Sequence, residues 1–89
     1  MTDLSTGKPR LKPGCRLAPA GDVLLIPEGV LRLQGPGARI LRACDGTKAV
    51  REIVDELLRE FPSAESTKVS EETTAFLTGL AGRGVVEFL

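Results

Sequence analysis

Four carboxylate side chains that could act as general acids or bases lie close together in the chain: Glu52, Asp55, Glu56 and Glu60. Their spacing places them on the polar face of a predicted helix, where a solvated charged face is more common than a catalytic site. The chain has no His, the side chain that most often exchanges protons near neutral pH and activates a Ser or Thr. These residues therefore predict a protein that is not an enzyme.

The two cysteines, Cys15 and Cys44, do not form a metal-binding motif. They lie far apart, with no C-x-x-C pair and no His, so a zinc site has no support. We predict two free thiols in a reducing cytoplasm, with no metal and no cofactor. We also expect no membrane partner and a cytoplasmic location, because no apolar run is long enough to cross a bilayer and no signal peptide is evident.

Gly35-Pro36-Gly37 could be taken for a phosphate-binding loop at the start of a helix. It lacks the G-K-[ST] ending, and Pro36 removes an amide that would face the phosphate. The three residues are better interpreted as the punctuation that begins a helix.

Size and charge narrow the function classes further. The chain has 89 residues, with 12 basic and 12 acidic side chains and no net charge. That length fits one small domain. A balanced charge argues against a nucleic-acid or anionic-membrane binder, which usually has a basic excess.

Short antiparallel strands are predicted in the first half of the chain. A weak alternation indicates a strand at 15–18, and residues 23–26 and 30–34 predict a β-hairpin. Residues 26–29 between them have Pro second and Gly fourth, the pattern of a type I turn.

Three helices are predicted after the hairpin. Pro36 begins a short one that Gly46 ends. Apolar residues at helical spacing mark a second over 50–61, and Ser70 caps a third that runs to Gly82. A β-like segment follows at 85–89. The predicted fold is α+β and winged helix-turn-helix-like, with N-terminal short antiparallel β-strands packed on three α-helices.

Residues 1–14 are predicted to be a flexible tail or a linker, because they are rich in Pro, Gly and cations and nearly lack large apolar side chains. The folded domain is expected over 15–89.

A winged helix suggests DNA binding, but residues 70–82 contain two Glu and no Lys or Arg, so they offer little to a phosphate backbone. The second hairpin strand, 30–34, instead predicts an open sheet edge that could accept an extended peptide as an added strand. A subunit-docking module without peptide specificity stays open as an alternative. Pro at Arg32 or Leu33 is predicted to weaken peptide binding while the domain stays folded, because Pro removes an edge N–H.

Several segments resemble the PqqD family. Residues 24–31 (L-L-I-P-E-G-V-L) are similar to its L-L-x-P-E-x-x-L segment, and 38–41 with Asp45-Gly46 to its helix ending in D-G. Glu52-Ile53 with Leu57, and Phe76-Leu77 with Leu80 and Gly84, are similar to its later helices. The resemblance covers 15–89. The chain departs from the family at Val23, where members often have an aromatic residue, and at Ala49, where many have a capping Thr; Thr47 or another group is then expected to cap the second helix.

The resemblance implies a non-catalytic peptide chaperone of pyrroloquinoline quinone biosynthesis, a recognition element for a ribosomally made precursor peptide. It implies that the chain binds the precursor PqqA as an added β-strand and presents it to the radical S-adenosylmethionine enzyme PqqE. Ten residues at matching positions would form the contact surface: Val30, Leu31, Arg32, Leu33 and Gln34 on the strand, with Val69, Thr73, Phe76, Leu77 and Leu80 opposite.

Overall fold

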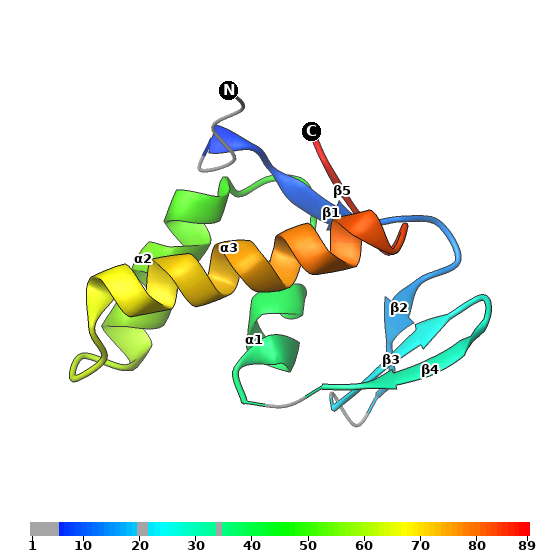
Figure 1. Ribbon diagram of the computed structural model, residues 1–89, viewed down its shortest axis with the longest axis horizontal. Coiled ribbons are helices and arrows are strands. Elements are labelled where there is room, and N and C mark those ends of the chain that lie inside the picture. The colour runs from blue at the N-terminus through cyan, green and yellow to red at the C-terminus, as the bar shows by residue number, and fades with distance from the viewer. Residues whose placement is uncertain (1–5, 20–21, 34) are drawn as a thin grey trace.

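The computed structural model describes residues 6–19, 22–33 and 35–89 and contains, within them, three helices and two small antiparallel sheets (Figure 1). The predicted α+β fold class is therefore confirmed. In chain order the elements are β1 (Pro9–Leu11), β2 (Arg16–Leu17), β3 (Val23–Ile26), β4 (Gly29–Arg32), α1 (Gly37–Arg42), α2 (Val50–Glu60), α3 (Ser66–Gly82) and β5 (Val86–Phe88).

The predicted hairpin is β3–β4, and β2 extends it to a three-stranded sheet of order β2-β3-β4. Pro27 and Glu28 connect the two strands, and neither has the positive φ that the mirror-image hairpin turns require. Gly29 follows with a φ of +148°, a conformation that glycine adopts without strain. The local Pro-Glu-Gly sequence thus sets the register of the hairpin.

The core is built mainly from the inward faces of the helices. Leu24 of β3 is buried against a cluster that includes Ile40 of α1, Ile53 of α2 and Leu77 of α3. The helical spacing predicted for α2 is confirmed, since Val50, Ile53, Val54 and Leu57 are all buried. Phe61 was expected to continue this row of buried apolar residues, but it ends the helix and is 48% exposed.

The start of α2 lacks a capping side chain at Ala49, as the sequence indicates, but Thr47 does not replace it. The Glu52 carboxylate accepts a hydrogen bond from the Ala49 main-chain N–H at 3.0 Å, which is one half of a capping box. Thr47 instead donates both its N–H and its hydroxyl to Oδ1 of Asp45.

The third helix, α3, begins at Ser66 rather than at the predicted Ser70, so the polar loop before it is shorter than expected. Residues 66–69 contain no Gly or Pro, and the Val69 N–H donates to the Glu65 carbonyl at 3.0 Å, which continues the helix toward the N-terminus. The added turn brings Lys68 into the helix. No helix among the described residues, α3 included, combines the length and the apolar character needed to cross a bilayer.

The prediction that residues 1–14 are a flexible tail is wrong for residues 9–11. These residues form β1, which pairs antiparallel with β5, so residues 9–11 and 86–88 lie side by side (Figure 1). Lys8 and Leu89 exchange main-chain hydrogen bonds of 3.1 and 2.8 Å beyond the strand. Pro9 is buried and its carbonyl accepts from the Gly46 N–H. Pairing with a distant segment provides the ordering that the local composition does not. The first five residues of the predicted tail lie outside the described residues.

Candidate functional site

One edge of the three-stranded sheet is formed by β4, which pairs with β3 alone. The Leu33 N–H donates to the Asp22 carbonyl at 2.9 Å. Leu31, two positions before Leu33, lies opposite Leu24. Hydrogen-bonded pairs alternate with non-bonded pairs in an antiparallel ladder. The N–H and C=O groups of Val30 and Arg32 therefore face away from β3, and no other described residue bonds to them.

The other side of β3 supports this assignment. The Ala18 N–H donates to the Val23 carbonyl at 2.8 Å, so Val23 and Leu25 face β2 while Leu24 and Ile26 face β4. The opposite edge of the sheet, β2, is just two residues long. In the described part of this sheet, β4 thus offers the longer edge for a further strand.

The side chains of β4 divide between solvent and core. Val30 is 62% exposed and Arg32 is also exposed, whereas Leu31 and Leu33 are half-buried and pack against the core cluster. Gln34, the fifth predicted contact on this strand, lies outside the described residues.

The opposite wall predicted on α3 is mostly core. Thr73, Leu77 and Leu80 are buried, and Leu77 has no exposed surface at all. Val69 and Phe76 are half-buried at the surface and pack against the same cluster. Two of the five α3 residues thus present side-chain surface to a partner in this structure.

The end of β4 and the wall formed by α3 meet at Gly37. A Cβ atom built on Gly37 would lie 3.2 Å from Cζ of Phe76 and 3.6 Å from Cβ of Leu33. The missing side chain lets the Phe76 ring and Leu33 approach the first turn of α1 from both sides. Gly37 therefore joins two predicted contact residues that are far apart in the sequence.

A pocket of about 720 Å³ lies next to this junction. Its lining combines the start of α1, the end of α2 and the first half of α3, and includes Ile40, Leu57, Phe61, Val69, Glu72 and Phe76. Sequence reasoning assigned Phe61 to the core and Gly35-Pro36-Gly37 to helix punctuation, and so missed the pocket. The sequence signal that could have indicated the pocket was Phe61, a large aromatic residue at the end of a helix, directly before Pro62.

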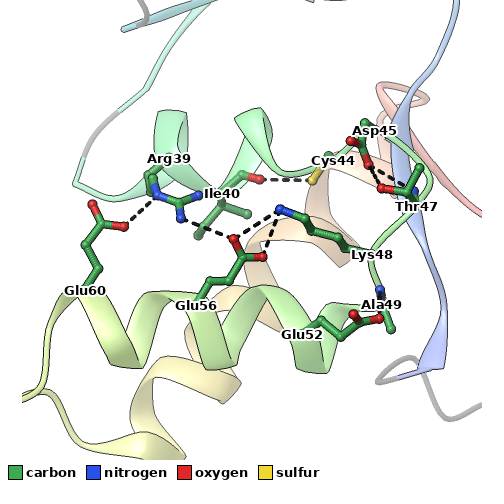
Figure 2. A network of polar contacts seen from close by, with 10 residues as sticks. All are labelled: Arg39, Ile40, Cys44, Asp45, Thr47, Lys48, Ala49, Glu52, Glu56 and Glu60. Carbon is green, nitrogen blue, oxygen red and sulfur yellow. Dashed lines mark hydrogen bonds and ion pairs between the residues drawn. The ribbon is translucent and has the colours of Figure 1, made fainter.

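Ion pairs connect α1 to α2 beside the pocket. Arg39 of α1 lies between two carboxylates of α2, with Nε 2.7 Å from Oε2 of Glu60 and Nη2 3.6 Å from Oε1 of Glu56 (Figure 2). Lys48 reaches Glu56 from the other side at 3.0 Å. The hydrogen bond from Lys48, with the nearby charges of Lys48 and Arg39, lowers the pKa of Glu56 below its usual value.

Both cysteines are free thiols, and Cys44 is buried. The Cys44 thiol donates to the Ile40 carbonyl at 3.2 Å (Figure 2), and burial, with the nearby Asp45 charge, raises its pKa to about 12. A thiol with so high a pKa is a poor nucleophile near neutral pH. Cys15 is half-buried and also free. The described residues contain no group of three or more side chains that could hold a metal ion.

Comparisons with known proteins agree with one another. The family model for coenzyme PQQ synthesis protein D (PqqD) matches residues 22–86. A PqqA binding protein of Azotobacter vinelandii is 36% identical over 83 residues, covering 89% of this chain and 88% of that protein. One from Stutzerimonas stutzeri is 42% identical over 55 residues, and the match spans 62% of this chain and 58% of that relative's length.

A solved structure has the same fold. It is the solution structure of the PqqD truncation of Methylobacterium extorquens PqqCD, described as a functional and stand-alone recognition element for ribosomally synthesized and post-translationally modified peptides. It superposes with a TM-score of 0.74 at 27% identity, covering 98% of this chain and 95% of that one.

Proposed function

Because the chain belongs to the PqqD family, we propose that it is a precursor-peptide chaperone. It binds a PqqA peptide as an added strand on β4 and presents it to the radical S-adenosylmethionine enzyme PqqE during pyrroloquinoline quinone biosynthesis. The relatives named PqqA binding protein support the choice of peptide.

The observation that carries this proposal is the outward direction of the Val30 and Arg32 main-chain groups. Each of these residues can donate one hydrogen bond and accept another from an extended peptide, without any change in the hairpin. The alternation also assigns different roles along the strand. Val30 and Arg32 supply main-chain groups to the peptide, while the N–H groups of Leu31 and Leu33 bond inside the hairpin.

The contact surface proposed here is smaller than the one that the resemblance implies. It comprises Val30 and Arg32 on β4, the half-buried side chains of Leu31 and Leu33, and Val69 and Phe76 on α3. Thr73, Leu77 and Leu80 support this surface from within the core. Pairing with main-chain groups gives affinity, and the side chains that line the path select the peptide.

A non-catalytic role is consistent with the residues. The sequence has no His to act as a base near neutral pH, and the Cys44 thiol is buried. In this proposal, the chemistry belongs to PqqE, and the domain contributes binding and positioning of the substrate.

Calorimetric titration of the domain with PqqA tests the proposal, with a scrambled peptide of the same composition as the control. We expect saturable binding of PqqA and no binding of the scrambled peptide. PqqE added to the domain–peptide complex is expected to form a ternary complex on a sizing column. Equal heats with both peptides would contradict strand-specific recognition, and failure to form the ternary complex would contradict the presentation step.

A further inference from the structure

The pocket beside Gly37 begins where β4 ends. Leu33, the first residue after β4, and Phe76 both lie against Gly37, and Phe76 also lines the pocket. The strand β4 runs toward the start of α1 (Figure 1). A peptide paired with Val30 and Arg32 advances about 3.3 Å per residue, so its main chain reaches the pocket within a few residues of the paired segment.

The pocket has the size and lining that are common for a binding site. Its volume of about 720 Å³ falls within the range of roughly 300–1,000 Å³ that is common for ligand sites. Ile40, Leu57, Val69 and Phe76 provide apolar walls, and Phe61 stands half-exposed beside them. An exposed aromatic ring at the rim of an apolar pocket favours a partner that covers it.

The charges around the pocket are not balanced. Arg39 also lines the pocket, but Glu60 and Glu56 already pair with it (Figure 2). Glu72 lines the pocket from α3 and forms no ion pair with any described residue. The pocket therefore has one carboxylate without a counter-ion, which favours a positively charged neighbour.

We propose that this pocket is a side-chain subsite for the bound peptide, which takes a large apolar residue next to a Lys or Arg that pairs with Glu72. The inference rests on the proposed function and extends it from main-chain pairing to a sequence requirement in the peptide. Phe61 contributes apolar contact, and Glu72 selects for charge.

The test measures the anisotropy of labelled PqqA with three variants of the full domain at low ionic strength. Phe61→Ala is expected to weaken binding about tenfold, the loss expected when a partly buried apolar contact is removed. Glu72→Lys is expected to weaken it about three- to fivefold, the size of an exposed ion pair. Glu71→Lys is the matched control: it changes the net charge equally, but residue 71 lines a different pocket between α2 and α3, so its effect should stay within about twofold.

Charge reversal in the peptide identifies the partner of Glu72. In a set of PqqA peptides with each Lys or Arg replaced singly by Glu, one peptide should bind Glu72→Lys more tightly than it binds the wild-type domain. If Phe61→Ala and Glu72→Lys both bind like wild type while Arg32→Pro binds weakly, the subsite is wrong and strand addition stands. If the wild-type domain binds no PqqA, the proposed function is wrong, and the subsite with it.

Discussion

The main-chain N–H of Leu33 lies 2.9 Å from the carbonyl oxygen of Asp22. This hydrogen bond closes the hairpin and determines which way each β4 residue faces. Leu33 uses its N–H inside the sheet, so the N–H of the preceding residue, Arg32, faces out. Two adjacent residues therefore have opposite roles, and substitutions at these positions should have opposite effects.

Arg32→Pro should weaken PqqA binding while leaving the domain folded, because it removes an N–H that bonds to no described residue in the free protein. Loss of one main-chain hydrogen bond is expected to cost about 1 kcal/mol, or roughly fivefold in affinity. Calorimetry measures the affinity, and circular dichroism checks the fold.

Two controls accompany that substitution. Arg32→Ala keeps the N–H and should weaken binding less than Arg32→Pro. Leu33→Pro removes the bond to Asp22 and should destabilise the hairpin itself, which corrects the expectation that Pro is tolerated at both positions. Equal affinities for Arg32→Ala and Arg32→Pro would mean that the side chain, not the main chain, carries the contact.

Leu77→Ala should lower the free energy of unfolding by about 2–5 kcal/mol, because it leaves a cavity in the core. The exposed Val30 is the contrast, and Val30→Ala should change stability by less than about 0.5 kcal/mol. Urea denaturation measures both. If Leu77→Ala does not fold, Leu77→Val replaces it in this measurement. A stable Leu77→Ala domain with weakened peptide binding would return Leu77 to the contact surface.

The Glu56 ion pairs should make stability depend on pH in the acidic range. The folded-state pKa of Glu56 is lowered from 4.5, so its stabilising effect is present above that value and is lost as the pH falls through the folded pKa. Thermal unfolding followed between pH 7 and pH 3 should show a smaller loss of Tm for Glu56→Gln than for wild type. Asp55→Asn is the control, because it removes a carboxylate of the same helix that forms no ion pair with any described residue. Identical curves for all three proteins would contradict the assignment.

Deletion of residues 1–14 should destabilise the domain, because it removes β1 and exposes the edge of β5. We expect a fall in Tm of about 5 °C or more, equivalent to roughly 1 kcal/mol in a domain of this size. Deletion of residues 2–5 removes none of the hydrogen bonds described here and is the control. Equal Tm values for the two deletions would support the original domain boundary at residue 15.

The parts of the fold that could be predicted have local signals. Pro27 and Gly29 mark the hairpin turn, and the apolar spacing of α2 marks its buried face. The family resemblance, carried by residues such as those at 24–31, is confirmed by the family match. The strand β1 could not be predicted in this way, because its partner is distant in the sequence: Arg10 pairs with Glu87. The Pro and Gly residues around β1 indicate a loop instead. The first turn of α3 lacks a capping side chain, so its start at Ser66 was missed.

One part of the candidate site, the edge strand, could be predicted from the sequence, and the other part, the pocket, could not. The edge strand followed from alternation along 30–34, and the direction of its main-chain groups follows from a two-residue hairpin loop. The pocket depends on how three helices pack, and no sequence pattern indicates that Phe61 and Phe76 line the same pocket. Leu77 and Phe76 are adjacent in the sequence, and only the rotation of α3 decides which of them is core.

Amide hydrogen exchange at Val30 and Arg32 tests the central claim most directly. Their N–H groups bond to no described residue and should exchange fast in the free domain, whereas those of Leu31 and Leu33 should already be slow. Saturation with PqqA should slow amide exchange at Val30 and Arg32 at least tenfold more than it slows exchange at Leu31 and Leu33. Fast exchange at Val30 and Arg32 in the saturated complex would contradict strand addition on β4.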